Sequence, residues 1–159
     1  MRAASTISLN VAIWVGLCVV VGWAAARVPQ RWLANDTFVT RIRPFERHGR
    51  IYDRCGIRRW KGRLPESNSL GRAARPSKRV LTGRSSVPGF IGETRRAEYV
   101  HWVILLAGPS FDLWSPTWVA RTMTVFGIGF NLPFIAVQRF NRARAVRSGT
   151  AVLGDGAVS

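Results

Sequence analysis

A histidine with nearby carboxylates stands where a polar stretch runs into an apolar one. Within ETRRAEYVHW, Glu98 precedes His101 by three residues and Glu93 lies two helical turns before it, so a helix would bring them together near Arg96. A carboxylate beside an imidazole orients the ring and favours its protonated form, an arrangement typical of a general base for a hydroxyl. We predict His101 as this base, supported by Glu98 or Glu93. The alternative is a helix end whose charges extend into lipid headgroups.

A second polar group interrupts the last apolar block. The stretch NLPFIAVQRFNRAR places Asn131 and Pro133 where lipid would disfavour them, and Pro133 frees backbone carbonyls for a polar neighbour. Gln138, Asn141 and Arg142 follow on neighbouring turns of the same helix end. We expect these side chains to bind a phosphate or a sugar, with interfacial anchoring as the alternative.

The cysteines and histidines show no metal-binding or disulfide pattern. Cys18 falls in an apolar block and Cys55 in a basic segment, so the two thiols would lie at different depths if the apolar block spans a membrane. Neither cysteine has ligand spacing to the other, to His48 or to His101. The sequence therefore predicts neither a disulfide nor a metal site.

Three apolar blocks must position these polar groups. No charged residue occurs in 5–26 or in 122–138, and Asp112 is the only one in 99–120. Each block approaches the roughly 20 residues that a helix needs to cross a hydrocarbon core. We predict an all-α integral membrane protein with about three transmembrane helices and a basic cytoplasmic segment between the first and the second.

The charge distribution favours a membrane surface as the polyanionic partner. The net charge is +16, and 18 of the 24 basic residues lie between Arg27 and Arg96. Such a charge suits nucleic acid or an anionic leaflet, but no nucleic-acid recognition motif is visible and the apolar blocks favour the leaflet. With the N-terminus outside, 22 of the 24 basic residues are cytoplasmic, as the positive-inside rule expects.

The first block reads as an uncleaved anchor. One arginine precedes it, whereas Arg27 and Arg31 follow at once, and a signal peptide enters with its positive end inside. A cleaved signal peptide is the alternative. The predicted parts are a transmembrane anchor in 1–26, a basic cytoplasmic or interfacial segment in 27–92, a helical hairpin carrying the site in 93–147 and a disordered tail in 148–159.

The basic segment contains one patterned stretch. In GRIYDRCGIRRWKGRL, five apolar or aromatic residues stand among arginines and a lysine. This pattern predicts an interfacial amphipathic element, or alternatively a solvated loop with a small satellite core. The stretch 67–86 is rich in Ser, Gly and Arg and is predicted to be a linker. The five apolar or aromatic residues of the patterned stretch are Ile51, Tyr52, Ile57, Trp60 and Leu64.

Three of these stretches resemble, in the same order, the glycosyl-4,4′-diaponeurosporenoate acyltransferases of bacterial C30 carotenoid biosynthesis. They are GRIYDRCGIRRWKGRLPE, ETRRAEYVHW and NLPFIAVQRFNRAR, and the likeness covers about Glu46 to Arg144. The resemblance implies a small multi-pass enzyme of the bacterial cell membrane. It would esterify a primary hydroxyl of the carotenoid's glucose with a fatty acyl group.

The resemblance also implies roles for individual residues. In that picture His101, supported by Glu98 or Glu93, deprotonates the sugar hydroxyl. Arginines would bind the donor's phosphates or stabilise the oxyanion. The predicted substrate-binding residues are Arg96, Trp102, Asn131, Gln138, Arg139, Asn141, Arg142 and Trp60.

The implied partners are a lipid-like acceptor, an acyl donor such as acyl-CoA, and anionic membrane lipids. No further cofactor and no nucleic acid are expected, and homo-oligomerisation is left open. With two lysines against 22 arginines, the composition suggests a high-GC bacterium, so another glycolipid remains an alternative acceptor. The alternative function is a non-catalytic membrane protein that binds anionic lipid or an acidic partner through its basic segment.

Overall fold

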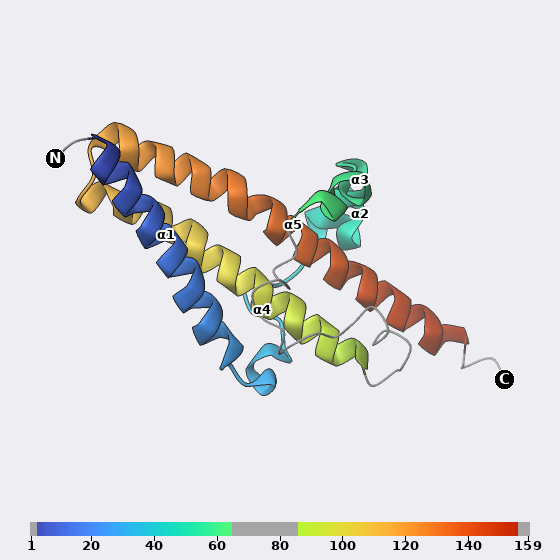
Figure 1. Ribbon diagram of the computed structural model, residues 1–159. Helices are drawn as coiled ribbons and strands as arrows, with labels where there is room; N and C mark the ends of the chain where they lie inside the picture. Colours follow the sequence, from blue (N-terminus) through green and yellow to red (C-terminus); the bar gives the residue numbers. More distant parts are fainter. Residues whose placement is uncertain (1–2, 65–85, 156–159) are drawn as a thin grey trace. The chain divides into compact units, whose positions relative to one another are not determined.

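All secondary structure that the structure describes is helical. The computed structural model describes residues 3–64 and 86–155, and no strand occurs within these ranges. The predicted all-α class is confirmed, whereas most of the linker predicted for 67–86 lies outside the described residues. The elements (Figure 1) are α1 (Ala3–Ala26), η1 (Gln30–Leu33), η2 (Pro44–Gly49), α2 (Arg50–Arg54), α3 (Ile57–Trp60), η3 (Lys61–Arg63), α4 (Ser86–Ala107), η6 (Gly108–Leu113) and α5 (Thr117–Asp155).

Two of the described helices are long and apolar enough to cross a membrane. They contribute Ser5–Ala26 of α1 and Thr117–Ser148 of α5. α4 is not one of them because it carries four charged residues near its middle, at positions 93, 95, 96 and 98. The structure thus supports two candidate spans, and the third crossing stays a prediction.

The chain divides into two compact units, which are described separately. The first unit comprises Met1–Pro29 and Arg96–Ile135, and the second comprises Gln30–Arg95 and Ala136–Ser159. Each unit therefore contains part of α4 and part of α5. The candidate residues are correspondingly divided between the two units.

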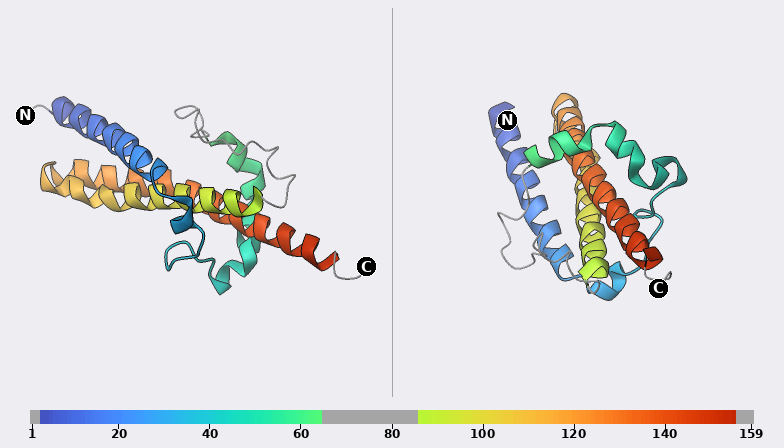
Figure 2. Two further views of the ribbon diagram at one scale, coloured as in Figure 1. Left: turned by 90° about the horizontal axis from the view of Figure 1, so that it is seen from below. Right: turned by 90° about the vertical axis from the view of Figure 1, so that its right-hand side faces the viewer.

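The first unit consists of three helices that pack together through aromatic and apolar side chains. α1, the later part of α4 and the first part of α5 run side by side (Figures 1 and 2), with a buried core of Trp14, Ile104, Phe111 and Ala120. A Cβ on Gly127 would stand 2.7 Å from Cη2 of the Trp14 indole. Glycine at this position is therefore what lets α1 and α5 approach closely.

A buried polar cluster joins α1 to the turn between α4 and α5. Asn10 is fully buried, and its amide donates to Ser115 Oγ at 2.9 Å. Trp114 Nε1 donates to Asn10 Oδ1 at 3.0 Å. Because both polar ends of the amide have partners, its burial carries no unsatisfied group, and the contacts fix the register of α1 in the first unit.

The second unit packs short helical turns on the later part of α5. Ile57 and Phe140 are both fully buried, and Lys61 Nζ lies 4.9 Å from the centroid of the Phe140 ring. Gly49 adopts φ +86°, and a Cβ there would lie 2.6 Å from that of Ala143, so both conformation and space require glycine. For Ile57, the structure therefore matches the satellite-core alternative rather than an interfacial side chain.

α5 continues beyond the predicted hairpin. Its described backbone is helical to Asp155, within the tail predicted to be disordered, and it includes Pro133 in its interior. No residue between 134 and 155 is a proline, so no second break interrupts the helical hydrogen bonds there.

Candidate active site

The predicted base lies between an amide and an aromatic ring in the first unit. His101 Nδ1, on α4, lies 2.9 Å from Oδ1 of Asn131, on α5. The imidazole stacks on Phe134, with ring centroids 4.6 Å apart and planes 13° apart. Asn131 and Phe134 are three residues apart on a helix, so both reach the same neighbour. These contacts fix the imidazole in position and in orientation.

The carboxylate predicted beside this imidazole is directed elsewhere. Glu98 is fully buried, and its Oε1 accepts a hydrogen bond from Trp102 Nε1 at 3.3 Å. Among the residues that the structure describes, no carboxylate forms a hydrogen bond or ion pair with His101. Glu93 belongs to the second unit. The side chain within hydrogen-bond distance of His101 is the Asn131 amide, a predicted substrate-binding group, and the support from Glu98 or Glu93 stays a prediction.

Arg96 closes the C-terminal end of α1. Its guanidinium donates to the carbonyl oxygen of Ala25 and, at 2.8 Å, to that of Val28. The last carbonyls of a helix lack partners within the helix and carry partial negative charge, so a guanidinium there stabilises the helix end. These contacts give Arg96 a structural role. The prediction for Arg96 was a role as a ligand for the donor's phosphates.

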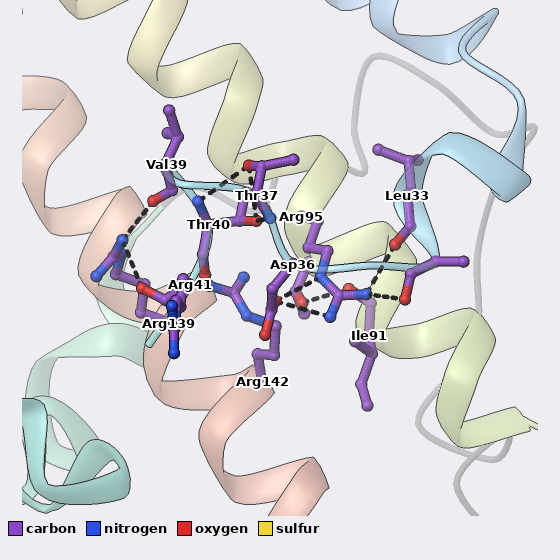
Figure 3. A network of polar contacts seen from close by, with 12 residues as sticks. Leu33, Asp36, Thr37, Val39, Thr40, Arg41, Ile91, Arg95, Arg139 and Arg142 are labelled. Atoms are coloured by element: carbon purple, nitrogen blue, oxygen red, sulfur yellow. Dashed lines mark hydrogen bonds and ion pairs between the residues drawn. The ribbon is translucent and has the colours of Figure 1, made fainter. Parts of the chain in front are cut away.

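In the second unit, three arginines hold the segment that follows η1 (Figure 3). Arg95 donates to the carbonyl oxygens of Leu33 and Ala34, each at 2.8 Å, and pairs with Asp36 at 2.7 Å. The sequence does not distinguish Arg95 from its neighbour Arg96 as the residue that holds this segment. The groups that Arg95 binds are mostly backbone carbonyls, and every residue has one.

The other two, Arg139 and Arg142, come from α5. Arg139 donates to the carbonyl oxygen of Val39 at 2.6 Å and forms an ion pair with Glu46, and Arg142 donates to the carbonyl oxygen of Thr40. Arg142 is 1% exposed. Both were predicted to bind substrate, and the structure places them in contacts that organise residues 39–46.

Glu46 is the centre of this cluster. Its carboxylate is fully buried and accepts hydrogen bonds from the Tyr52 hydroxyl at 2.7 Å and from the Arg43 amide at 2.8 Å, besides the ion pair with Arg139. A buried carboxylate is tolerated when a cation and several donors surround it. The cluster therefore fixes η2 and α2 to α5 within the second unit.

The remaining predicted residues also lie in the second unit. Trp60 Nε1 donates to the carbonyl oxygen of Cys55 at 3.2 Å, and Lys61 Nζ donates to Asn141 Oδ1 at 3.4 Å. Gln138 is half-buried on α5. The structure thus brings His101 together with Asn131, and Glu98 with Trp102. It places Arg96 at the end of α1 in the first unit and the other candidates in the second unit.

Both cysteines in the described part of the chain are free thiols, Cys18 half-buried and Cys55 exposed. Within residues 3–64 and 86–155, no three His, Cys, Asp or Glu side chains gather as a metal site would require.

The Glu46 cluster should be visible in the ionisation of Tyr52. Burial and, next, the hydrogen bond to Glu46 raise the pKa of Tyr52 above its ordinary value. The chain has two tyrosines, so in a Tyr99→Phe variant Tyr52 alone gives a tyrosinate absorbance. We expect no tyrosinate near pH 10, where tyrosine ordinarily ionises, and a signal only at a higher pH.

The direction of this effect on stability follows from the raised pKa. Protonated Tyr52 stabilises the folded unit below the unfolded-state pKa, and this contribution is lost as the pH rises through the folded-state value. The same variant unfolded in denaturant is the control and should titrate near pH 10. An identical titration of folded and unfolded protein would show that the contact between Tyr52 and Glu46 is absent.

Comparison with known proteins identifies what the chain is similar to. Residues 29–149 match the family described as glycosyl-4,4′-diaponeurosporenoate acyltransferase. Proteins of that name from Staphylococcus aureus strains bovine RF122 / ET3-1 and MRSA252 are each 28% identical over 120 residues, covering 74% of this chain and 72% of the relative. The protein of strain USA300 is 27% identical with the same coverage. No solved structure matches.

Proposed function

Because the chain belongs to the glycosyl-4,4′-diaponeurosporenoate acyltransferase family and is an acyltransferase, we propose that it esterifies a sugar hydroxyl of that glycosylated carotenoid, or of a related glycolipid, with a fatty acyl group. The observation that carries the proposal is the family match over residues 29–149, which includes both His101 and Asn131. Membership of an enzyme family favours this function over that of a non-catalytic lipid-binding protein.

The proposed reaction is transfer of an acyl group from a thioester such as acyl-CoA. The sugar hydroxyl oxygen forms a bond to the acyl carbonyl carbon while His101 takes the hydroxyl proton. The carbon–sulfur bond then breaks, and the leaving thiolate takes the proton back from the imidazolium. No oxidant, reductant or further cofactor enters this balance.

The donor's phosphates require cations that are accessible. Arg96, Arg139 and Arg142 donate to backbone carbonyls of the protein itself. We therefore favour the basic residues of α2, α3 and η3 with exposed side chains as the phosphate ligands. These are Arg50, Arg54, Arg59 and Arg63, while the exposed Arg58 pairs with Asp53.

Both proposed substrates are amphiphiles, which suits an enzyme in a membrane. The two apolar helices support membrane association. We propose a multi-pass protein of the bacterial cell membrane in which α4 and η6 supply a third crossing, so that donor and acceptor meet at the bilayer boundary. α1 exposes Val11, Val15, Val19 and Val20, a surface suited to lipid or to a second copy of the chain.

The segment after α1 is suited to an anionic lipid surface. Residues 27–64 contain 11 basic and three acidic residues, and all three acids are paired with arginines inside the second unit. The same segment exposes Trp32 by 68%, Phe38 by 81% and Phe45 by 69%. Exposed aromatic rings among arginines are typical of a surface that enters the headgroup region.

We expect Phe38 to lie among lipid headgroups. In a variant with Cys18→Ala, Cys55→Ser and Phe38→Cys, a nitroxide at position 38 should be more accessible to oxygen than to a water-soluble nickel reagent in nanodiscs containing anionic lipid. The matched control carries Arg59→Cys instead, an exposed site that should show the reverse preference. Equal accessibility at both sites would contradict the interfacial placement.

The acyl transfer is tested directly with purified protein in nanodiscs. A glycosylated carotenoid and a fatty acyl-CoA are supplied, and products are followed by mass spectrometry. We expect a product heavier by one acyl group, and none when the acceptor lacks its sugar. Absence of any ester with several glycosylated acceptors and thioester donors would overturn the proposal, whereas acylation of a different glycolipid alone would correct the acceptor.

A further inference from the structure

The contacts of Asn131 determine which nitrogen of His101 carries a proton. Asn131 Nδ2 lies 2.8 Å from the carbonyl oxygen of Gly127, one helical turn earlier. A carbonyl oxygen can only accept a hydrogen bond, so the NH₂ group of the amide must face Gly127. The amide oxygen, Oδ1, is then the atom directed at His101, in agreement with the 2.9 Å contact.

The contact with Oδ1 of Asn131 also fixes which imidazole nitrogen carries the proton. Oδ1 of an amide has no proton to give, so Nδ1 of His101 must be the donor in this hydrogen bond. In a neutral imidazole the other nitrogen, Nε2, then has a free lone pair and can accept a proton. Among the described residues, nothing forms a hydrogen bond with Nε2.

Two features keep this arrangement in place. Asn131 is fully buried, so water does not compete for its amide oxygen. Stacking on Phe134, with planes 13° apart, opposes rotation of the imidazole. An amide also orients the ring without adding the negative charge that a carboxylate would bring.

We infer that Asn131 is a positioning residue that holds His101 as the Nδ1–H tautomer, so that Nε2 receives the proton of the acceptor hydroxyl. The chemical role of Nε2 rests on the proposed acyl transfer, but the tautomer does not and can be measured without substrate. In the reaction step, the hydroxyl proton moves to Nε2 as the ester bond forms. The imidazolium then passes this proton to the leaving thiolate.

The tautomer of His101 can be measured because the chain has two histidines, so a single substitution removes the signal of the other one. A His48→Asn background leaves His101 alone, and asparagine tolerates the positive φ of position 48. With histidine labelled by ¹⁵N in the ring, solid-state NMR in lipid bilayers above the pH of imidazole protonation should show a protonated Nδ1 and an unprotonated Nε2. A ring that is protonated mainly on Nε2 would overturn the inference.

Substitution of Asn131 should change the tautomer and the rate together. In Asn131→Leu we expect the Nε2–H form to gain population and kcat to fall about 10²-fold with little change in KM, as for loss of a correctly oriented base. Asn131→Asp can still accept from Nδ1–H and should retain more activity. Leu132→Ala, on the exposed side of the same helix, is the matched control.

The two proposals fail in different ways. An Nδ1–H tautomer in a protein that acylates no glycosylated acceptor would leave the geometry standing and overturn the proposed function. Unchanged kcat in an Asn131→Leu protein whose tautomer has shifted would overturn the assignment of Nε2 as the base, although acyl transfer itself would stand.

Discussion

Replacing His101 by alanine should abolish acyl transfer while the protein still inserts into the membrane. Loss of a general base lowers rates by roughly 10²- to 10⁴-fold, so product should fall below a few per cent of wild type. The imidazole touches Asn131 and Phe134 at the edge of the first unit's core rather than within it. The measurement is initial ester formation at equal amounts of membrane-inserted protein.

The other histidine provides the control. His48 is exposed and lies in the second unit, so His48→Asn should leave the rate near that of wild type. His101→Gln keeps a group that can donate to Asn131, and it should insert normally yet remain inactive. Wild-type rates for His101→Ala would exclude His101 as the base.

Removal of the Glu46 carboxylate should have the largest effect on stability. Glu46→Ala leaves the cation of Arg139 and the hydroxyl of Tyr52 without this buried acceptor. Breaking a buried ion pair by deleting one partner costs about 3–5 kcal/mol, a large part of a typical folding free energy. Hydrogen exchange of the amides in residues 37–49 should therefore accelerate by roughly 10²- to 10⁴-fold, read by mass spectrometry.

A second ion pair in the same unit provides a matched comparison. Asp53 pairs with Arg58 at 2.7 Å, but the two side chains are 31% and 64% exposed. Exposed pairs contribute up to about 1 kcal/mol, so Asp53→Ala should change exchange only slightly. Similar acceleration in the two variants would contradict the central position of Glu46. Peptides from the first unit serve as the internal reference.

Helix positions could largely be predicted from the sequence, but their ends could not. The uncharged block 5–26 corresponds to α1, Ala3–Ala26, because an apolar run of that length has little alternative to a helix. The helical hairpin was predicted to end at residue 147, yet α5 continues to Asp155. The polar residues that suggested an end instead contact the second unit's own segments, which no periodicity along α5 reveals.

The members of the candidate site were visible in the sequence, but their pairing was not. His101 and Asn131 lie in different apolar blocks, and their contact depends on how α4 and α5 align. That alignment follows from packing, such as the close approach of Gly108 to Thr124, where an added Cβ would lie 3.3 Å from the Thr124 Cα. Glu98 was expected to pair with His101 because a linear sequence displays only neighbours along one helix, such as residues three or four apart, and not contacts between two helices.

The arginine contacts to backbone carbonyls imply an uneven tolerance to mutation. The partners include the carbonyls of Val28, Leu33, Ala34, Val39 and Thr40, which persist whatever side chain stands at those positions. The guanidinium forks have no substitute, since a lysine presents a compact charge rather than several planar donors. The side chains of this segment can therefore change among related proteins while the arginines that bind its backbone stay the same. In a distant relative, the segment is then identified more readily by those arginines than by its own amino-acid sequence.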